Sequence, residues 1–442
     1  MANDAFLGMR TTQSWVTDER PKNWMEQLAI LYPNGMMDLT NLTTLAGQEM
    51  TDDPEFNHWE KELDDQSAAI TGVYTNAGLS SAYTSGGVVG TVLYLKMSAA
   101  DVKTFVAGMM VQVRNSADPL MDTHARVQDV TVAGASSFIA VMLWEADTTS
   151  TDSDLSDANT VLVVGTAYEE GADTPKGVHF QSEKRTGYCQ ISRRSLSITG
   201  TALVTKLRRN PQGYAEDVRE TREYYGLDKE KQLLFSVPRE TTGPDGEPLR
   251  TTGGVMWATR AYAKTGNVSN YKTDPAYAGK AWTDADGGIK YFEDKIRLNF
   301  RFGNPDLKLG VIGDVGLAAI NELARHNSQF RVTEGQTRFG MKVYIWITPF
   351  GTLTLKTHPL FSQDATLSRT LLIYEPKMVK RKVLNERATR WYPDPRKSQK
   401  MTTNNGRDKI VEEMMGEEGY RHKFPQANAL LYNLGVTNTY SA

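Results

Sequence analysis

The chain has 442 residues, a hydrophobic content of 40%, a charged content of 23% and a formal net charge of -3 at pH 7. This length allows two or three hydrophobic cores, and this composition excludes a largely disordered chain. A net charge so close to zero gives the whole chain no electrostatic reason to bind nucleic acid, so only a local cluster of charge could support that function.

The cysteine count and the hydropathy restrict the compartment. The single cysteine, Cys189, cannot form an intrachain disulfide, which fits a reducing cytoplasm. Because it lies in a strand-like run, we expect a buried packing residue rather than a nucleophile. No signal-peptide pattern opens the sequence, and no apolar run approaches the roughly 20 residues of a membrane helix. We therefore expect a protein that is neither exported nor inserted into a membrane.

Residues 1–60 contain large apolar side chains among turn-forming residues, without a long periodic segment. A short helix is expected near Trp24, because Trp24, Leu28 and Leu31 share one helical face. So short a segment cannot bury these side chains within itself, and we predict an extended N-terminal arm. Its contacts, with its own core or with another chain, are assigned to Trp15, Trp24, Met25, Leu28 and Leu31.

Five short runs rich in β-branched residues follow, separated by turn residues. They lie at 88–95, 109–114, 125–132, 137–144 and 160–164. Short strands between turns predict a small barrel or sandwich, so we assign residues 85–187 to an inserted β-rich domain. Extended strands at 61–84 and 188–210 are expected to flank it.

An acidic run from Asp147 to Asp157 lies inside this segment and suggests a calcium site. It lacks the glycine at the sharp turn and the terminal glutamate of a helix-loop-helix calcium site. A solvated loop is the favoured interpretation.

A long charged helix is predicted from Asn210 to about Phe235. Asn210 is a good N-cap, and Pro211 at the first helical position loses nothing by lacking an N–H. Apolar residues form a narrow stripe at Tyr214, Val218, Tyr225, Leu233 and Leu234. The remaining positions are mostly charged: Glu216, Asp217, Arg219, Glu220, Arg222, Glu223, Asp228, Lys229, Glu230 and Lys231. This pattern is typical of a helix packed along one side, with its polar faces toward water or neighbouring chains.

The rest of the chain alternates helices and strands. Helical spacing of apolar residues predicts a helix within 284–300 and another after the cap Asp314. Strands are predicted at 309–312, 342–348 and 351–356, which together with the second helix make a compact α/β module. The runs at 369–374, 378–384, 389–392 and 427–434 are predicted to be strands that return to the sheet beneath the long helix.

One segment carries concentrated positive charge. Between residues 377 and 400, nine basic residues face only Glu386 and Asp394, a local net charge of +7. The basic residues are Lys377, Lys380, Arg381, Lys382, Arg387, Arg390, Arg396, Lys397 and Lys400. Two interpretations are open: contact with phosphates or with an acidic patch on another chain, or a solvated strand face that charge protects against edge pairing.

Common catalytic and cofactor-binding motifs are missing from the sequence. It contains no Walker A motif, dinucleotide-binding glycine motif, HExxH zinc motif or GxSxG nucleophile motif. The six histidines are scattered without the spacing of metal ligands. We expect no catalytic residue, no metal and no cofactor.

The order of elements nevertheless resembles a known family, the major capsid proteins of tailed bacteriophages. The resemblance is carried by the strand Tyr188 to Gly200, the proline-capped helix ending in Leu233-Leu234-Phe235, and the loop Thr251 to Gly254. It continues through Val161 to Thr166 with Glu169 to Gly171, and again from Leu309 to the C-terminus. Each motif is weak by itself, and their order supplies the specificity.

The resemblance implies an α+β fold of the Hong Kong 97-like capsid type. Its expected parts are an N-terminal arm (1–60), extended-loop strands (61–84 and 188–210) with the β-rich insertion (85–187), a spine helix with peripheral domain (211–308), an axial domain (309–368) and returning peripheral strands (369–442).

The implied function is that of a non-enzymatic major capsid protein, closing into hexamers and pentamers of an icosahedral shell around double-stranded DNA. Implied partners are further copies of the chain, portal and scaffolding proteins, a decoration protein and, nonspecifically, the packaged DNA. The implied location is the virion, after assembly in the bacterial cytoplasm. Two alternatives stay open: a tail tube or sheath subunit, and a hydrolase with a β-rich accessory domain.

Overall fold

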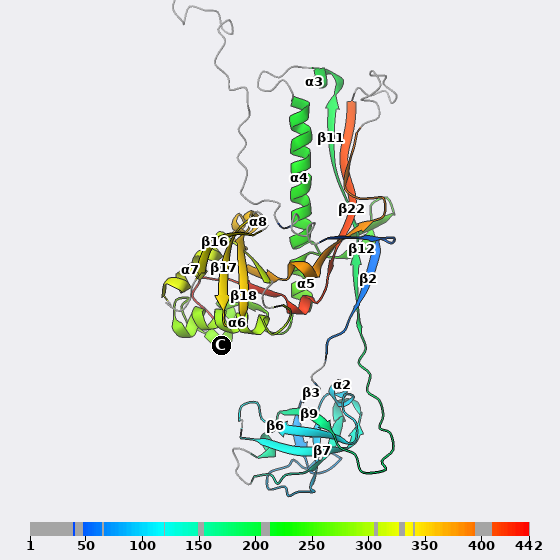
Figure 1. The fold of residues 1–442 in the computed structure, drawn as a ribbon, viewed down its shortest axis with the longest axis vertical. Coiled ribbons are helices and arrows are strands. Elements are labelled where there is room, and N and C mark those ends of the chain that lie inside the picture. Colours follow the sequence, from blue (N-terminus) through cyan, green and yellow to red (C-terminus); the bar gives the residue numbers. More distant parts are fainter. Residues whose placement is uncertain are drawn as a thin grey trace, which may run out of the picture. The chain divides into compact units, whose positions relative to one another are not determined.

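The computed structural model describes residue 39 and residues 47–63, 66–118, 120–148, 154–204, 213–304, 308–326, 332–338, 341–393 and 409–441. The chain forms two compact units, which Figure 1 draws. Unit 1 comprises residues 1–58 and 185–442, and unit 2 comprises residues 59–184. Helices and sheets occur together in unit 1, which confirms the predicted α+β class. No described helix is both long and apolar enough to cross a membrane.

Unit 2 is built on one antiparallel sheet of seven strands in the order β3-β9-β6-β7-β8-β5-β4. The strands are β3 (Ser67–Ala69), β4 (Gly72–Tyr74), β5 (Val92–Lys96), β6 (Met109–Arg114), β7 (Asp122–Thr131), β8 (Phe138–Leu143) and β9 (Thr160–Thr166). The two ends of this order, β3 and β4, are separated by only two residues, so the sheet curls until its edges approach each other, as in a barrel. Alternate strand residues such as Leu93, Val111 and Val141 point into one core, and the helix α2 (Ala99–Val102) adds Val102 to it.

The predicted start of this β-rich segment, residue 85, is wrong. Residues 67–74 supply both outer strands, β3 and β4, whereas the sequence had placed them in the flanking extended strands. Strands of three residues are too short to show a period of two, which explains the error. The chain enters and leaves this unit through β2 (Glu55–Glu60) and β10 (Glu183–Tyr188), which pair as a two-stranded ribbon.

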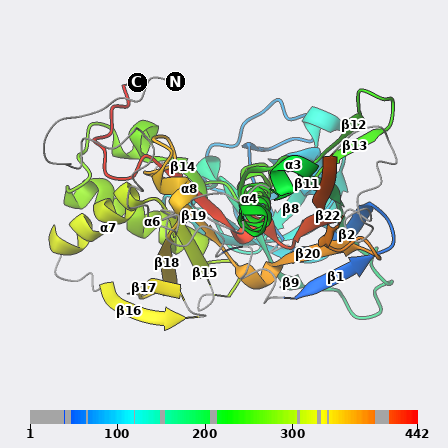
Figure 2. The same ribbon diagram turned by 90° about the horizontal axis from the view of Figure 1, so that it is seen from above.

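A five-stranded sheet lies beside the long helix in unit 1. Its strands are β1 (Gln48–Thr51), β11 (Gln190–Thr199), β20 (Val379–Leu384), β21 (Arg390–Tyr392) and β22 (Lys409–His422). The order is β1-β20-β22-β11, and β21 pairs with β22. The helices are α3 (Gly200–Val204) and α4 (Gly213–Phe235), and α4 runs alongside β11 (Figure 1, Figure 2).

The sequence-based expectations for the long helix are confirmed in part, and one strand of the sheet beside it was not predicted. The predicted C-terminus of the long helix, Phe235, is confirmed, while Asn210 and Pro211 lie outside the described residues. Lys229 and Glu230, which were placed on polar faces, are buried. The 14-residue strand β22 was missed because four glutamates interrupt its apolar pattern.

The second large sheet of unit 1 has seven strands in the order β14-β23-β19-β15-β18-β17-β16. They are β14 (Val268–Asn270), β15 (Lys308–Ile312), β16 (Val332–Arg338), β17 (Met341–Thr348), β18 (Gly351–Thr357), β19 (Leu371–Tyr374) and β23 (Ala429–Tyr432). The associated helices are α5 (Val255–Tyr262), α6 (Lys290–Asn299), α7 (Asp314–His326) and α8 (Pro359–Ser362). A separate exposed hairpin consists of β12 (Arg239–Thr242) and β13 (Pro248–Thr251).

This sheet corrects the predicted destination of two C-terminal runs. Strand β19 pairs with β15 here and β23 pairs with β19, and of the four predicted strands only β20 and β21 join the sheet beside α4. A fully buried apolar strand gives no sequence signal of which sheet it enters. The core of this part also includes α6, where Phe292 stacks on Trp346 with ring centroids 4.6 Å apart. The predicted boundary at residue 309 therefore divides one hydrophobic core.

Candidate functional site

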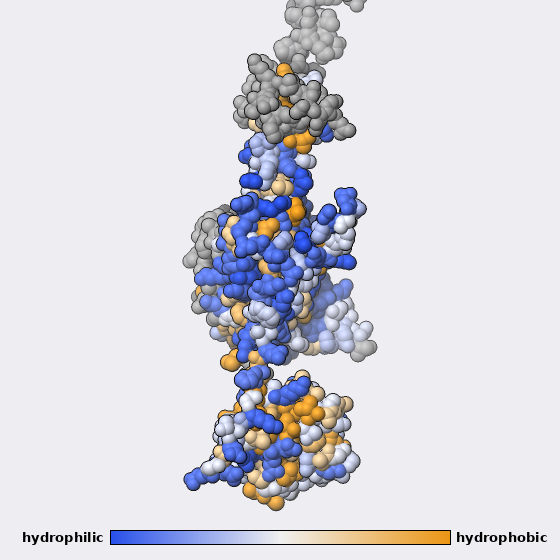
Figure 3. All heavy atoms as spheres, turned by 90° about the vertical axis from the view of Figure 1, so that its right-hand side faces the viewer, coloured by the Kyte–Doolittle hydropathy of each residue, from blue (hydrophilic) through white to orange (hydrophobic). Residues whose placement is uncertain are grey.

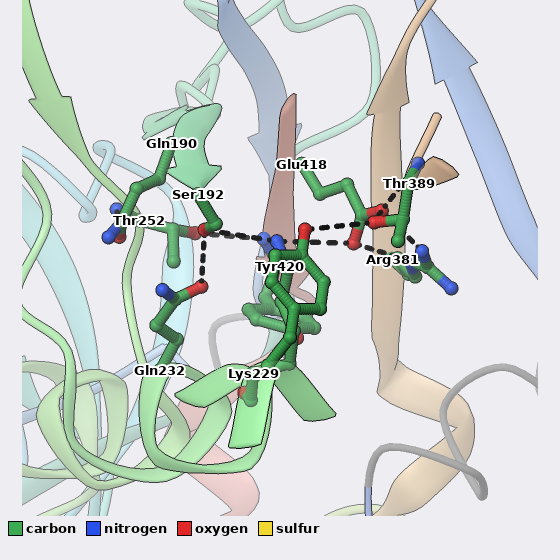
Figure 4. Close-up of polar contacts among 10 residues, drawn as sticks. Gln190, Ser192, Lys229, Gln232, Thr252, Arg381, Thr389, Glu418 and Tyr420 are labelled. Atoms are coloured by element: carbon green, nitrogen blue, oxygen red, sulfur yellow. Dashed lines mark hydrogen bonds and ion pairs between the residues drawn. The ribbon is translucent and has the colours of Figure 1, made fainter. Parts of the chain in front are cut away.

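A network of buried charged and polar side chains connects α4 to the sheet beside it (Figure 4). We call Ser192, Lys229, Arg381, Thr389 and Glu418 the buried ion network. Ser192 comes from β11, Lys229 from α4, Arg381 from β20 and Glu418 from β22, while Thr389 precedes β21. Lys229, Arg381 and Thr389 thus meet at the carboxylate of Glu418, and Ser192 joins the network through Lys229.

The carboxylate of Glu418 is the centre of this network. It is buried, and both of its oxygens accept hydrogen bonds. Arg381 donates from Nε to Oε2 over 2.8 Å and from Nη2 to Oε1. Thr389 donates to Oε1 from its hydroxyl and from its backbone N–H. A two-pronged guanidinium contact of this kind fixes orientation as well as charge.

Lys229 approaches Glu418 from the helix. Its Nζ lies 3.5 Å from Oε2 of Glu418 and donates to Oγ of Ser192 over 3.1 Å. The Ser192 hydroxyl in turn donates to Oε1 of Gln232, one helical turn beyond Lys229, over 3.1 Å. Tyr225, one turn before Lys229, donates its hydroxyl proton to Oγ1 of Thr389 over 3.1 Å, because the Thr389 hydroxyl itself donates to Glu418. Positions 225, 229 and 232 share one helical face, which explains why this polar stripe faces the sheet.

Burial and charge pairing oppose each other in the pKa values of these groups. Burial alone would raise the pKa of Glu418, but Lys229 and Arg381 outweigh it and hold the pKa at about 2. Burial lowers the pKa of Lys229, and Glu418 offsets part of this effect. The guanidinium of Arg381 stays charged, because Glu418 outweighs its burial and raises its pKa. The network therefore places two basic side chains, Lys229 and Arg381, around one carboxylate.

This arrangement predicts a specific pH dependence. The folded-state pKa of Glu418 lies below its unfolded value of 4.5, so its stabilisation is present above pH 4.5 and is lost as the pH falls toward 2. The loss should be about 3 kcal/mol, since each pKa unit corresponds to about 1.36 kcal/mol. Glu418→Gln should remove this part of the pH dependence, as measured by hydrogen exchange of β22 amides between pH 5 and 2.5. Equal slopes for both proteins would contradict the assigned role of Glu418.

A second buried polar cluster lies on the same helix at Glu230. The Glu230 carboxylate accepts a hydrogen bond from the backbone N–H of Leu39 over 3.0 Å and lies 2.9 Å from Nε2 of His358. Nδ1 of His358 accepts from the backbone N–H of Leu360, so the proton on Nε2 is the one donated to Glu230. Leu39 itself is fully buried among Leu233, Leu234 and neighbouring apolar residues. The chain just before β1 is thereby attached to the base of α4.

The residues that the sequence singled out lie elsewhere or carry other roles. Arg381, Lys382 and Arg387 pair within the chain with Glu418, Glu49 and Glu417. Carboxylates from β1 and β22 therefore neutralise much of the expected net charge of +7. Counting charges within residues 377–400 does not include these carboxylates. Arg390 is exposed and stacks on the Tyr392 ring at 4.6 Å, and in the same segment Lys377 is exposed and Lys380 is partly exposed.

Arg396, Lys397 and Lys400 lie outside the described residues, as do the arm residues Trp15, Trp24, Met25, Leu28 and Leu31.

The acidic run is not simply a solvated loop. Asp147 is buried and accepts a hydrogen bond from the Tyr83 hydroxyl over 2.6 Å, and Asp154 is buried and accepts from Ser156. Asp154 therefore stabilises a local turn, whereas Asp147 connects two segments that are 64 positions apart in the sequence. Residues 149–153 lie outside the described residues. Within the described part of the chain, no group of three or more His, Cys, Asp or Glu side chains is placed to hold a metal ion.

Cys189 is buried, as expected for a packing residue. Burial raises the pKa of its thiol to about 12, and Glu417 and Glu418 add to the effect. The reactive thiolate is therefore suppressed at neutral pH. Together with the fully engaged Lys229, this leaves the centre of unit 1 suited to holding elements together rather than to chemistry.

Comparison with known proteins places these features in a family context. The family model described as "SU10 major capsid protein" matches residues 11–435. The "Major capsid protein" of Pseudomonas phage PaMx41 is 27% identical over 206 residues, which is 46% of this chain and 47% of that protein. The chain thus spans about half the length of that curated relative in the alignment.

Solved structures give a weaker likeness. A structure titled "Mycobacterium phage Adephagia" has a TM-score of 0.40 and 9% identity, covering 98% of this chain and 100% of that one. The capsid of Myoviridae phage XM1 has a TM-score of 0.38 and 15% identity, covering 60% and 81% of the two chains. Because both TM-scores are below 0.5, the family assignment depends on the sequence match.

Proposed function

The chain belongs to the SU10 major capsid protein family, and from that membership we infer that it is the repeating subunit of a phage head shell. We propose that copies of the chain close into hexamers and pentamers, and that these build an icosahedral shell around double-stranded DNA. The function is binding rather than catalysis.

The observation that carries this proposal is the attachment of α4 to a long sheet by the buried ion network. The network fixes one face of the helix, while Arg219, Glu220 and Arg222 on other faces are exposed. A helix that is held rigidly along one side and is polar on the others can present charges to neighbouring copies at constant geometry. A shell subunit needs such rigidity, because errors in angle accumulate over many copies.

Further partners are proposed on the same basis. A portal and a scaffolding protein would be needed to start and shape the shell, and a decoration protein could bind its exterior. Nonspecific contact with packaged DNA is proposed for Lys377, Arg390, Arg396, Lys397 and Lys400, since Arg381, Lys382 and Arg387 pair with carboxylates of the same chain. The subunit would assemble in the bacterial cytoplasm and function in the virion.

The N-terminal arm is proposed to pack on an adjacent subunit. Its anchor is Leu39, which Glu230 holds at the base of α4. The 38 residues before this anchor span up to about 130 Å when fully extended, which is enough to reach a neighbouring chain. Trp15, Trp24, Met25, Leu28 and Leu31 would supply the apolar contacts.

Electron microscopy of the purified protein tests the proposal. Closed shells or ring-shaped capsomers are expected. Tubes would indicate a tail tube or sheath subunit, and a discrete small oligomer would indicate the hydrolase alternative. Either of these two outcomes would overturn the proposed function.

Breaking α4 should prevent assembly. Val218 lies within the helix, so Val218→Pro removes a backbone hydrogen bond and creates a clash with the preceding turn, costing roughly 3 kcal/mol or more. We expect soluble or aggregated protein but no shells in micrographs. Val218→Ala, which keeps the helix, is the matched control and should assemble. Normal shell yields from the proline variant would refute the role of a continuous α4.

A further inference from the structure

One strand of unit 2 has an open edge beside a hollow. Strand β7 pairs with β6 only through residues 122–126, whereas its pairing with β8 continues to Thr131. Among the described residues, no strand pairs with residues 128–131 on the side away from β8. A bulge between Val127 and Asp129 marks the point where the pairing with β6 has ended. Alternate peptide groups of this edge are therefore available for hydrogen bonding.

The hollow beside this edge has a volume of about 720 Å³. Its walls are the loop 103–108, the β7 residues 126–130, Tyr168 and the segment 173–179. This volume is within the range of binding sites, and its length along β7 suits a strand of four to six residues at about 3.3 Å per residue. We call it the β7 groove.

One wall of the β7 groove is held in place by specific contacts. Nε of Arg126 donates to the carbonyl oxygen of Ala167 over 3.1 Å, and the Tyr168 hydroxyl donates to that of Ala107 over 3.2 Å. The Tyr168 ring also covers Gly108, where a Cβ would lie 2.2 Å from a ring carbon. Because the wall is already fixed, an incoming strand would lose little free energy to reorganisation.

The lining chemistry defines the kind of occupant. Val106, Val130 and Val178 provide apolar surface, and the formal charges are Lys103, Arg126 and Lys176 against Asp129 and Asp173. An extended backbone is required by the open edge, and alternate side chains of such a strand would point in opposite directions. Apolar residues would face the groove, and carboxylates would meet the excess of cations.

We propose that the β7 groove binds an extended segment of a different protein, with alternating apolar and acidic residues, as an added strand on β7. Among the described residues, the strand rich in apolar and acidic residues is β22, which is held within unit 1 by β11 along residues 409–418 and by β20 and β21 along parts of its other side. A second copy of the chain therefore has no matching free strand in the described part of its structure. This proposal concerns unit 2 alone and does not depend on shell formation. Unit 2 also exposes apolar residues on one face (Figure 3).

A labelled peptide tests the proposal on the full-length protein. The probe is a capped octapeptide of alternating valine and glutamate with a fluorophore, and its binding is followed by fluorescence anisotropy. Saturable binding is expected, together with at least five-fold slower hydrogen exchange of the amides at 128–131. A lysine-for-glutamate peptide should bind at least ten-fold more weakly, and N-methylation of alternate peptide amides should abolish binding.

Matched charge reversals locate the site. Lys176→Glu should weaken peptide binding at least five-fold, whereas Lys61→Glu, which changes another exposed lysine outside the groove, should leave it unchanged. Absence of saturable binding, or protection elsewhere than 128–131, would overturn the proposal. Protection of these amides in assembled protein without peptide would also overturn it, because a second copy would then be the occupant.

Discussion

Glu418→Leu is expected to lower the free energy of local opening around α4 and β22 by about 3–5 kcal/mol, because it leaves two buried cations without their carboxylate. Lys229 can escape part of this cost by losing its proton, since burial already lowers its pKa. Arg381 cannot, because a guanidinium stays protonated at any pH a folded protein tolerates. The loss should appear as faster hydrogen exchange of α4 and β22 amides, and assembly should fail.

Glu413 on the same strand is the matched control. It pairs with Arg193, whose side chain is 61% exposed, at 2.7 Å. A pair so open to solvent contributes about 0–1 kcal/mol, so Glu413→Leu should change exchange little. Adding Lys229→Met to Glu418→Leu should recover part of the loss, since one unpaired charge is then removed. Equal effects of Glu413→Leu and Glu418→Leu would show that the buried ion network has no special role.

Sequence reasoning predicted the elements better than their partners. The α+β class and the major capsid protein family were predicted correctly, and strand β15 and helix α7 were found because each carries a clear apolar pattern or cap. The pairing of β19 with β15 and of β23 with β19 was not predicted, since all three strands are apolar runs that would fit either sheet. Which buried strands are neighbours is decided by long-range packing, which no local pattern encodes.

The candidate site was missed for a related reason. Lys229 and Glu230 are two charges in a helix full of charges, and only the facing Glu418 and His358 distinguish them. Their partners are 189 and 128 positions away in the sequence, on strand β22 and before α8. One signal was available: Tyr225, Lys229 and Gln232 fall on the same helical face as the apolar residue Leu233, where a lysine must be paired to be tolerated. The basic residues at 377–400 led to the opposite error, since the sequence predicted an unpaired positive surface. Several of these residues pair with carboxylates that belong to β1 and β22.

Removing unit 2 should leave unit 1 folded. Replacing residues 61–182 with a short Gly/Ser linker would make β2 and β10 the two strands of a hairpin. The hydrophobic core of unit 2 draws only on residues between 68 and 163, and the two described clusters of unit 1 include none of them. The buried ion network also lies wholly in unit 1. We therefore expect helical circular dichroism and the slow exchange of α4 and β22 amides to persist.

A point variant provides the complementary measurement in the full-length chain. Val141 is fully buried in the core of unit 2, so Val141→Asp places a carboxylate there without a partner, which should unfold unit 2. Exchange should then become fast in β5 to β9 and stay slow in α4, because the two cores share no residue. The deletion variant could instead be insoluble, or Val141→Asp could accelerate exchange in α4 as well. Either result would show that unit 2 contributes to the stability of unit 1, although their hydrophobic cores share no residue. If both results hold, the insertion folds as an independent module, and the affinity of its β7 groove can be altered without weakening the part of the subunit proposed to build the shell.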